Sequence, residues 1–313
     1  MNDYITRKIK SKNKEKYNYE YFDKRKNKLN KKSINKYLKD VYIPPAYNNV
    51  KINKNKSAKI LAIGVDEKGR SQYTYNKKTI KKNSKSKFKK LIDFGKNHSK
   101  LIKKINSDLN GPFNKDKLIS LILKLIINCN FRVGNEKYTC DNKSYGVSTL
   151  EKKHLKFIKD KLIINFIGKK GVKNICNVND KKIINYLKIL YKNSKSNKIF
   201  TYTEDGKTKN IKSSDVNNYL KNLGNYTTKN FRTWNANIEL IKNINKCKSN
   251  DNILKKCIEN VAKKLHHTAS VCKKNYIDPK LIKLFETNSK LFYKQFKNGN
   301  VNKNYTEFLI KNY

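Results

Sequence analysis

Four segments between residues 131 and 276 carry side chains suited to attack on a phosphodiester. FRVGNEKY contains Arg132, FIGKKG contains Lys169, KNFRTW contains Arg232, and LHHTASVCKKNY places His267 nine residues before Tyr276. A tyrosine hydroxyl can act as a nucleophile, and fixed cationic donors stabilise the charge that builds on phosphoryl oxygens. Each residue alone has a plainer interpretation, because a charged side chain near a core helix or in a turn is usually solvated and most tyrosines are structural.

Taken in order, these segments resemble the catalytic domain of type IB DNA topoisomerases of the poxvirus kind and their bacterial relatives. The order is Arg, Lys, Lys-x-x-Arg and His-x8-Tyr, and KYTCDNKSYGVSTLEKKH and KKNYIDP resemble the family's flanking segments. Nearer the start, IPPAY and DEKGRSQYTYN resemble the IPPAW and KGRxQYxY segments of these enzymes. The resemblance extends over residues 17–290.

The resemblance implies a role for each of the five residues. Tyr276 is expected to attack the backbone phosphorus and keep the 3′ side as a phosphotyrosyl ester, freeing a 5′ hydroxyl. Arg132, Arg232 and His267 are expected to hold the non-bridging oxygens. Lys169 is expected to protonate the departing 5′ oxygen, with help from Arg132. Because the covalent ester conserves bond energy, resealing requires neither ATP nor a metal, and we expect no cofactor.

The sequence departs from the family pattern at three places. Lys170 follows Lys169 where the poxvirus enzymes carry an acid, and alignment on the preceding glycine favours Lys169 as the acid. His266 and His267 form a doublet, and the nine-residue spacing to the nucleophile selects His267. Trp234 stands where poxvirus enzymes have tyrosine, and we expect it to pack in the core.

A second group of residues matches family positions that contact DNA: Arg70, Gln72, Tyr73, Tyr75 and Tyr138. The alternative interpretation is cross-strand packing, the usual role of alternating aromatic residues. Contact with DNA is favoured for Tyr73 and Arg70, and the two interpretations are balanced for Tyr75.

Two other functions fit part of the pattern. A tyrosine recombinase or integrase uses the same covalent chemistry, but those enzymes usually show His-x-x-Arg where this chain has Lys229 before Arg232. A basic DNA-packaging protein would explain the charge without explaining four catalytic segments in family order. The topoisomerase interpretation is therefore favoured over both.

The charge of the chain indicates a polyanionic partner. The 313 residues include 74 Lys and Arg against 24 Asp and Glu, a formal net charge of +50. Self-repulsion of that size is tolerated mainly when the partner is a polyanion, and we expect duplex DNA. Lys, Asn and Ile are abundant throughout, as in a chain from an AT-rich genome, so part of the charge is expected to be solvated. No apolar run reaches the ~18 residues of a membrane-spanning helix, so we expect no membrane.

The start of the chain and the cysteines indicate an intracellular protein. MNDYITRKIKSKNK lacks the apolar segment of a secretory signal. The six cysteines show no C-x-x-C pair and no zinc-ligand spacing, so we expect reduced thiols and no metal. Within the cell, a virus particle or a viral replication compartment are the more specific locations considered.

The elements that must position these residues divide into three expected parts. Residues 1–16 read as a disordered basic arm, and residues 17–84 as a small β-rich domain. In that domain we expect a strand from Tyr17, a helix capped by Ser33 and ending near Asp40, and a hairpin over residues 59–75 turning at DEKGR. KKNSKSKFKK is expected to link this domain to residues 85–313.

In residues 85–313, the apolar run from Lys117 to Cys129 predicts a core helix. Strands are expected at 155–158, 162–167 and 172–178, the last two joined by a hairpin at Gly168–Gly171, with helices from there to the end. The fold class is thus α+β: a small β-rich domain and a mostly helical, tyrosine-recombinase-like catalytic domain with a short antiparallel sheet. We expect the two to form a C-shaped clamp on DNA as a monomer.

Overall fold

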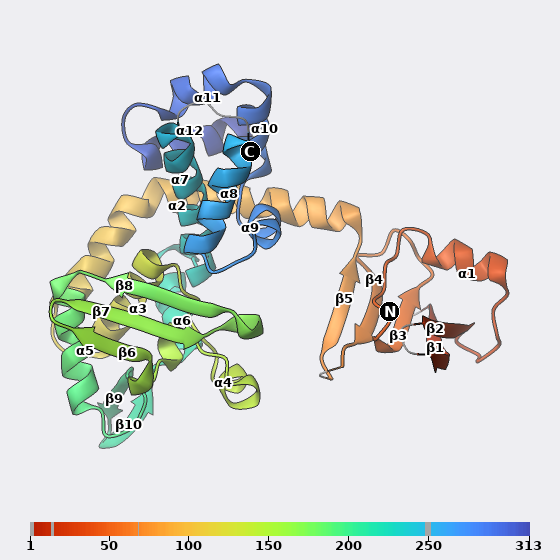
Figure 1. Ribbon diagram of the computed structural model, residues 1–313, viewed down its shortest axis with the longest axis horizontal. Helices are drawn as coiled ribbons and strands as arrows, with labels where there is room; N and C mark the ends of the chain where they lie inside the picture. The colour runs from red at the N-terminus through yellow and green to blue at the C-terminus, as the bar shows by residue number, and fades with distance from the viewer. Residues whose placement is uncertain (1–2, 14–15, 68, 248–251) are drawn as a thin grey trace. The chain divides into compact units, whose positions relative to one another are not determined.

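The computed structural model describes the chain except residues 1–2, 14–15, 68 and 248–251. It divides into two compact units, residues 1–87 and residues 88–313, the first built mainly of strands and the second mainly of helices (Figure 1). This is the α+β class expected from the sequence. No helix in the described part of the chain is both long and apolar enough to cross a membrane.

The first unit is a five-stranded antiparallel sheet with one short helix. Its strand order is β2-β1-β3-β4-β5, and Ile5, Val50, Ile52, Leu61 and Ala62 form the centre of its buried core. The bounds are β1 (Tyr4–Asn13), β2 (Lys16–Phe22), α1 (Lys31–Leu38), β3 (Asn48–Asn53), β4 (Ile60–Val65) and β5 (Ser71–Tyr75).

The predicted disordered arm is wrong for residues 4–13, which form β1. This strand pairs with β2 on one side and with β3 on the other. Ile5 is fully buried, and the buried Arg7 donates hydrogen bonds to the carbonyl oxygens of Pro44 (3.0 Å) and Tyr47 (2.8 Å). The lysines on the outward-facing positions hid this alternation in the sequence. Residues 1, 2, 14 and 15 lie outside the described part.

The predicted linker is also wrong, because KKNSKSKFKK lies inside α2 (Lys77–Asn110). Lysine is a good helix former, and the helix needs only one apolar stripe to pack. That stripe includes Phe88, Leu91 and Phe94, which are fully buried. The boundary between the two units falls within this helix, after residue 87 rather than after residue 84. In α1, the N-cap is Asn30 and not Ser33.

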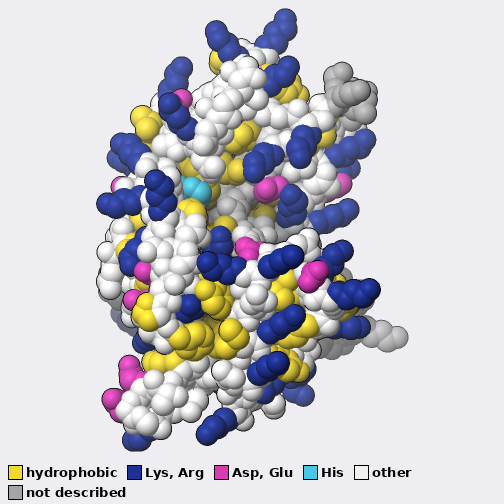
Figure 2. Space-filling model, turned by 90° about the vertical axis from the view of Figure 1, so that its left-hand side faces the viewer, with side chains coloured by type: hydrophobic (Ala, Val, Ile, Leu, Met, Phe, Trp, Pro, Cys, Tyr) yellow, Lys and Arg dark blue, Asp and Glu magenta, His cyan; other side chains and the backbone are white. Residues whose placement is uncertain are grey.

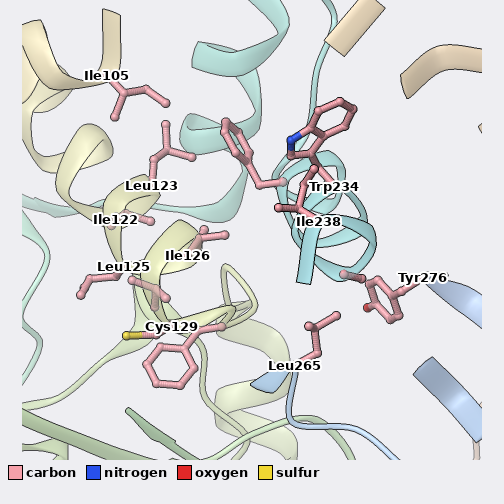
Figure 3. Close-up of a cluster of buried hydrophobic side chains, with 14 of the residues drawn as sticks. Ile105, Ile122, Leu123, Leu125, Ile126, Cys129, Trp234, Ile238, Leu265 and Tyr276 are labelled. Atoms are coloured by element: carbon pink, nitrogen blue, oxygen red, sulfur yellow. The ribbon is translucent and has the colours of Figure 1, made fainter. Parts of the chain in front are cut away.

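In the second unit, the other elements pack around the apolar helix α3 and helix α7. Its core includes Leu123, Ile126, Trp234, Ile238 and Leu265 (Figure 3), so the expected burial of Trp234 is confirmed. The bounds are α3 (Lys115–Cys129), α4 (Glu136–Asn142), η1 (Val147–Thr149), η2 (Lys152–His154), η3 (Lys169–Gly171), α5 (Lys181–Asn193), α6 (Ser213–Gly224), α7 (Thr228–Lys246), α8 (Ile253–Lys264), α9 (Ala269–Asn275), α10 (Pro279–Thr287), α11 (Ser289–Phe296) and α12 (Val301–Asn312).

A three-stranded antiparallel sheet, β6-β7-β8, packs beside these helices. Its strands are β6 (Leu155–Ile158), β7 (Lys161–Ile167) and β8 (Lys173–Val178), as the apolar runs predicted. The expectation of helices alone after this sheet is wrong, because β9 (Thr201–Glu204) and β10 (Lys207–Asn210) form a hairpin. Its polar residues give little apolar alternation, so the sequence pattern did not show it.

The expectation that all cysteines are reduced is wrong for one pair. Cys129 and Cys176 form a disulfide across 47 residues of sequence, whereas Cys140, Cys247, Cys257 and Cys272 are free. The last turn of α3 packs against β8, and this packing brings the two thiols together. Neither sequence spacing nor composition reports that contact.

Candidate active site

Four of the five predicted catalytic residues meet in one cluster within the second unit. Arg132 Nη2 lies 3.1 Å from His267 Nε2, and Arg232 Nη2 lies 3.0 Å from the same nitrogen. The His267 and Tyr276 rings are 4.8 Å apart between centroids, and the guanidinium carbon of Arg232 is 5.4 Å from the Tyr276 ring centre. The cluster therefore combines a phenol, an imidazole and two guanidinium groups.

Tyr276 is 8% exposed and ends helix α9 as its C-cap residue. Burial by itself would raise the pKa of Tyr276, but the positive charges of Arg232 and Arg132 outweigh burial and hold the pKa below its ordinary value. Figure 3 shows the ring at the edge of the apolar core, near Leu265. A buried phenol with a lowered pKa is suited to act as a nucleophile.

Arg232 lies on α7 and is 3% exposed. Burial lowers its pKa to about 10, an effect that the Tyr276 phenol opposes and Arg132 reinforces, so the side chain stays charged at neutral pH. Besides His267, its Nη2 contacts the Leu265 carbonyl oxygen (3.0 Å), whereas Nε and Nη1 have no hydrogen-bond partner among the described residues. A buried cation with spare donors is suited to an anionic ligand.

His267 is neutral in this arrangement. Burial, followed by the charges of Arg132 and Arg232, lowers its pKa to about 3. Because a guanidinium group can only donate, His267 Nε2 accepts from Arg232 Nη2 at 3.0 Å. Arg132 Nη2 lies near both ring nitrogens, 3.1 Å from Nε2 and 3.4 Å from Nδ1. An anion between the arginines would compete for these donors and would favour the protonated ring.

The chain after α3 is shaped so that Arg132 reaches the cluster. Asn130 ends the helix in the left-handed conformation, with φ of 53°. The Arg132 carbonyl oxygen accepts from Val147 N at 2.9 Å. This pairing brings Gly134 and Gly146 so close that a Cβ on Gly146 would lie 2.4 Å from the Gly134 Cα. Two glycines are therefore required for the loop that carries Arg132.

Asn237 holds the main chain of Tyr276, and sequence reasoning did not find it. This fully buried side chain donates to the carbonyl oxygens of Thr233 (2.8 Å) and Tyr276 (3.0 Å) and accepts from Asp278 N (2.8 Å). It lies on α7, five residues after Arg232. A polar residue at a helix position that shares its face with the apolar Trp234 and Ile241 is the signal that could have identified it.

Lys169 lies outside the contacts that join these four residues, on the exposed connection between β7 and β8. Its charge contributes to the lowered pKa of His267. Gly168, just before it, is packed so tightly that a Cβ would lie 2.4 Å from Asn174 Nδ2, whereas Lys170 adopts a φ of 63°. His266, the other doublet member, contacts the Cys129 carbonyl oxygen through Nε2 (3.1 Å).

The residues predicted to contact DNA lie elsewhere. In the first unit, Tyr73 and Tyr75 are exposed and their rings stack at 6.3 Å. Arg70 is paired with Asp66 (2.7 Å), and Gln72 Nε2 donates to the same carboxylate (2.9 Å). Gln72 lies on the opposite face of β5 from Tyr73, because neighbouring strand residues alternate. In the second unit, Tyr138 is 52% exposed on α4.

Positive side chains dominate the visible surface. Figure 2 shows Lys and Arg side chains over the whole of one face, with few Asp or Glu side chains between them and exposed apolar groups in the lower half. Within the described residues, no group of three or more His, Cys, Asp or Glu side chains is placed to hold a metal ion.

In comparisons with known proteins, both units are similar to DNA topoisomerases. Residues 76–301 match the catalytic core of eukaryotic DNA topoisomerase I, and residues 18–66 match the N-terminal domain of bacterial DNA topoisomerase IB. DNA topoisomerase 1B of Acanthamoeba polyphaga mimivirus is 37% identical over 295 residues, covering 89% of this chain and 87% of that protein. DNA topoisomerase 1B of Vaccinia virus (strain Copenhagen) is 23% identical over 240 residues, covering 72% of each.

Among solved structures, the post-cleavage complex of the XerH site-specific recombinase with a palindromic difH substrate aligns with 72% of this chain and 59% of that chain. The TM-score is 0.39 and the identity is 15%.

Proposed function

The chain belongs to the type IB DNA topoisomerases, and on that premise we propose how its residues nick and reseal one strand of duplex DNA. Type IB topoisomerases break one strand, let the free end rotate to release supercoils of either sign, and rejoin the strand without ATP. What this chain contributes is the set of side chains that perform each step.

In the proposed cleavage step, the Tyr276 hydroxyl oxygen attacks the backbone phosphorus. The new P–O bond links the 3′ side of the strand to the phenol as the bond to the 5′ oxygen breaks. Lys169 donates a proton to that 5′ oxygen, and the phenol proton passes to solvent. Resealing reverses these transfers: the 5′ hydroxyl attacks, Lys169 takes the proton back, and the phenol leaves.

The proposed role of Arg132, Arg232 and His267 is to bind the pentacoordinate phosphorus. Negative charge builds on its non-bridging oxygens, and fixed donors bind that state better than the ground state. The spare donors of the buried Arg232 support this role. Protonation of His267 beside the phosphate would supply a further donor.

One observation carries the proposal: Tyr276, one of 20 tyrosines, is buried with its ring against His267 and beside Arg232. Lys169 is the exception, because it lies on the exposed connection after β7. We propose that binding of DNA brings the Lys169 ammonium group to the 5′ oxygen.

We further propose that Arg70, Gln72, Tyr73, Tyr75 and Tyr138 contact the duplex, and that the two units close around it as a C-shaped clamp formed by one monomer. The two exposed, stacked tyrosines of β5 support contact with DNA. Gln72 shares its face with the core of the sheet, so it would reach DNA only from the edge formed by β5. The viral relatives favour a viral replication compartment or virus particle as the location.

Relaxation of a supercoiled plasmid tests the proposal. The plasmid carries no recombination site, and the buffer contains EDTA and no ATP. We expect relaxation by the wild-type protein and trapping of DNA on Tyr276. The Tyr276→Phe variant should lose both, whereas Tyr293→Phe, at a partly buried tyrosine of the second unit, should keep both. Relaxation by Tyr276→Phe would overturn the assignment, and dependence on a paired recombination site would favour a recombinase.

A further inference from the structure

The Cys129–Cys176 disulfide joins the two segments that carry Arg132 and Lys169. Cys129 is the last residue of α3, three residues before Arg132. Cys176 lies in β8, which pairs with β7. The connection between these two strands contains Lys169. The proposed mechanism makes no use of this bond.

The disulfide also forms part of the wall of an open pocket of about 540 Å³. Cys129 is almost fully buried and Cys176 is half-buried, so Cys176 is the more accessible residue of the two. Lys242, Lys263 and Lys264 lie at the same pocket, with Glu239 paired to Lys264. Because Glu239 offsets the charge of Lys264, Lys242 and Lys263 leave the pocket with two positive charges beside the disulfide.

We propose that Cys129–Cys176 is a site of reversible thiol–disulfide exchange, opened by a small anionic thiol that enters this pocket. The thiolate attacks Cys176 Sγ, forming a mixed disulfide and releasing Cys129 as a thiolate. A second thiolate attacks the small-molecule sulfur of the mixed disulfide and releases Cys176. The two thiols become one disulfide, and the two cysteines take up two protons from solvent. Exchange with the small-molecule disulfide reverses the reaction.

The state of the bond sets how firmly the two proposed catalytic segments are held. When oxidised, the bond ties the end of α3 to the sheet that bears Lys169. When reduced, α3 and β8 are held by packing alone, and the Lys169 connection is free to shift relative to Arg132. Displacements of about 1 Å at a catalytic group can cost about 10²-fold in rate. Where thiols are kept reduced, a disulfide is usually transient or redox-sensing, which fits this use.

The chemical part is tested without DNA. Thiol alkylation and peptide mass spectrometry measure how fast Cys129 and Cys176 become free in 2-mercaptoethanesulfonate and in cysteamine. Each rate is divided by that of the same thiol on a small disulfide. We expect the anionic thiol to be about tenfold faster. The preference should fall in K242Q/K263Q and persist in K192Q/K221Q, which removes the same charge away from the pocket.

Equal rates with the two thiols, or an equal preference in both double variants, would overturn the role of the pocket. Alkylation of both cysteines in protein that has met no reductant would overturn the site itself. These results do not depend on activity, so they separate this proposal from the topoisomerase mechanism on which its catalytic part rests.

The catalytic part is tested by single-turnover cleavage of a DNA duplex by oxidised and by reduced protein. We expect cleavage to be about tenfold slower after reduction and to recover on reoxidation. C129S/C176S should cleave at the slow rate in both conditions, and C140S, which removes an exposed free thiol, should keep the full response. A wild-type cleavage rate that does not change on reduction would overturn the link between this bond and catalysis.

Discussion

At the scale of single residues, the role proposed for Arg232 depends on the shape of the guanidinium group as well as its charge. Arg232 uses one nitrogen for two contacts inside the protein, to His267 and Leu265, and its buried Nε and Nη1 have no hydrogen-bond partner among the described residues. A lysine at this position would keep the charge, but its ammonium group lacks the planar fork that spans two oxygens of a phosphate.

We therefore expect Arg232→Lys to slow single-turnover cleavage by about 10²- to 10³-fold, the usual cost of losing an oriented donor. Arg25→Lys, at an exposed position of the first unit, serves as the control and should cleave at the wild-type rate. A loss smaller than tenfold would show that charge alone is sufficient at Arg232.

The four histidines make the folded protein sensitive to acid. Burial lowers the pKa of each: to about 3 for His267, to about 4 for His154, and in the same direction for His98 and His266. The folded state keeps these rings neutral at pH values where the unfolded chain, with ordinary pKa values near 6.5, would bind protons. Their contribution to stability is therefore complete above about pH 6.5 and declines as pH falls towards the folded pKa values.

Urea unfolding should show a midpoint that falls steadily between pH 7 and pH 4. Replacing His267 by Asn should make this dependence shallower, because one of the four titrating rings is gone. A midpoint that stays constant over this range, or an unchanged slope in His267→Asn, would contradict the neutral state assigned to these histidines.

At the scale of elements, helix α7 is tied to the segment from Tyr276 to Asp278. Asn237 joins them through two hydrogen bonds in a fully buried setting, to the Tyr276 carbonyl oxygen and from the Asp278 amide, and it also donates to Thr233 on its own helix. Its loss leaves the Tyr276 carbonyl oxygen and the Asp278 amide without this partner, and an unsatisfied buried polar group costs about 1–3 kcal/mol.

Asn237→Ala should lower the free energy of unfolding by about 3 kcal/mol and slow formation of the covalent adduct while DNA affinity changes little. Asn243→Ala, on the same helix, removes one hydrogen bond to the Glu239 carbonyl oxygen from a half-buried site and is the matched control. Equal effects of the two substitutions on adduct formation would refute a positioning role for Asn237.

The Arg132 loop depends on close approach of backbone at Gly146. A methyl group there would meet the Gly134 main chain at 2.4 Å and the Arg132 carbonyl oxygen at 2.7 Å. We expect Gly146→Ala to lower stability by about 1–3 kcal/mol and to displace Arg132, slowing cleavage. Gly111→Ala, where a methyl group meets only ordinary contacts, should be neutral in both measurements.

At the scale of the whole molecule, a net charge of +50 should make DNA binding strongly dependent on salt. Each phosphate contact releases counterions, and a protein with 6–10 such contacts loses about 10³- to 10⁵-fold in affinity between 50 and 200 mM salt. Fluorescence anisotropy with two duplexes of equal length and unrelated sequence should give the same steep slope. A loss of affinity below tenfold would mean that most lysines are solvated and do not contact DNA, as expected if an AT-rich genome accounts for many of them.

The revised fold of the first unit changes one whole-molecule expectation. A disordered basic arm could be removed with loss of nonspecific DNA affinity alone. Because β1 pairs with both β2 and β3 and buries Ile5, deleting residues 1–13 should instead unfold the first unit. Loss of the strand signal in circular dichroism would report this, and an intact spectrum would restore the arm interpretation.

The sequence by itself predicted the family of this protein and the chemistry proposed for it. The sequence contains the family's residues in the family's order: Arg132, Arg232, His267 and Tyr276. The apolar runs of α3, β6, β7 and β8 can also be recognised in the sequence, because buried positions must be apolar. The lysine-rich surface gave weaker signals. It concealed β1 and the helical character of residues 81–90, since an exposed face places almost no constraint on residue type.

Only the tertiary structure decided which distant groups touch. Asn237 and Tyr276 are 39 residues apart, and Cys129 and Cys176 are 47 apart. Arg7 anchors the IPPAY segment from a strand that reads as a basic tail. Such contacts arise when packed elements bring together polar groups that must be satisfied once water is excluded. That requirement acts on pairs of residues in space, so neither member identifies its partner in the sequence.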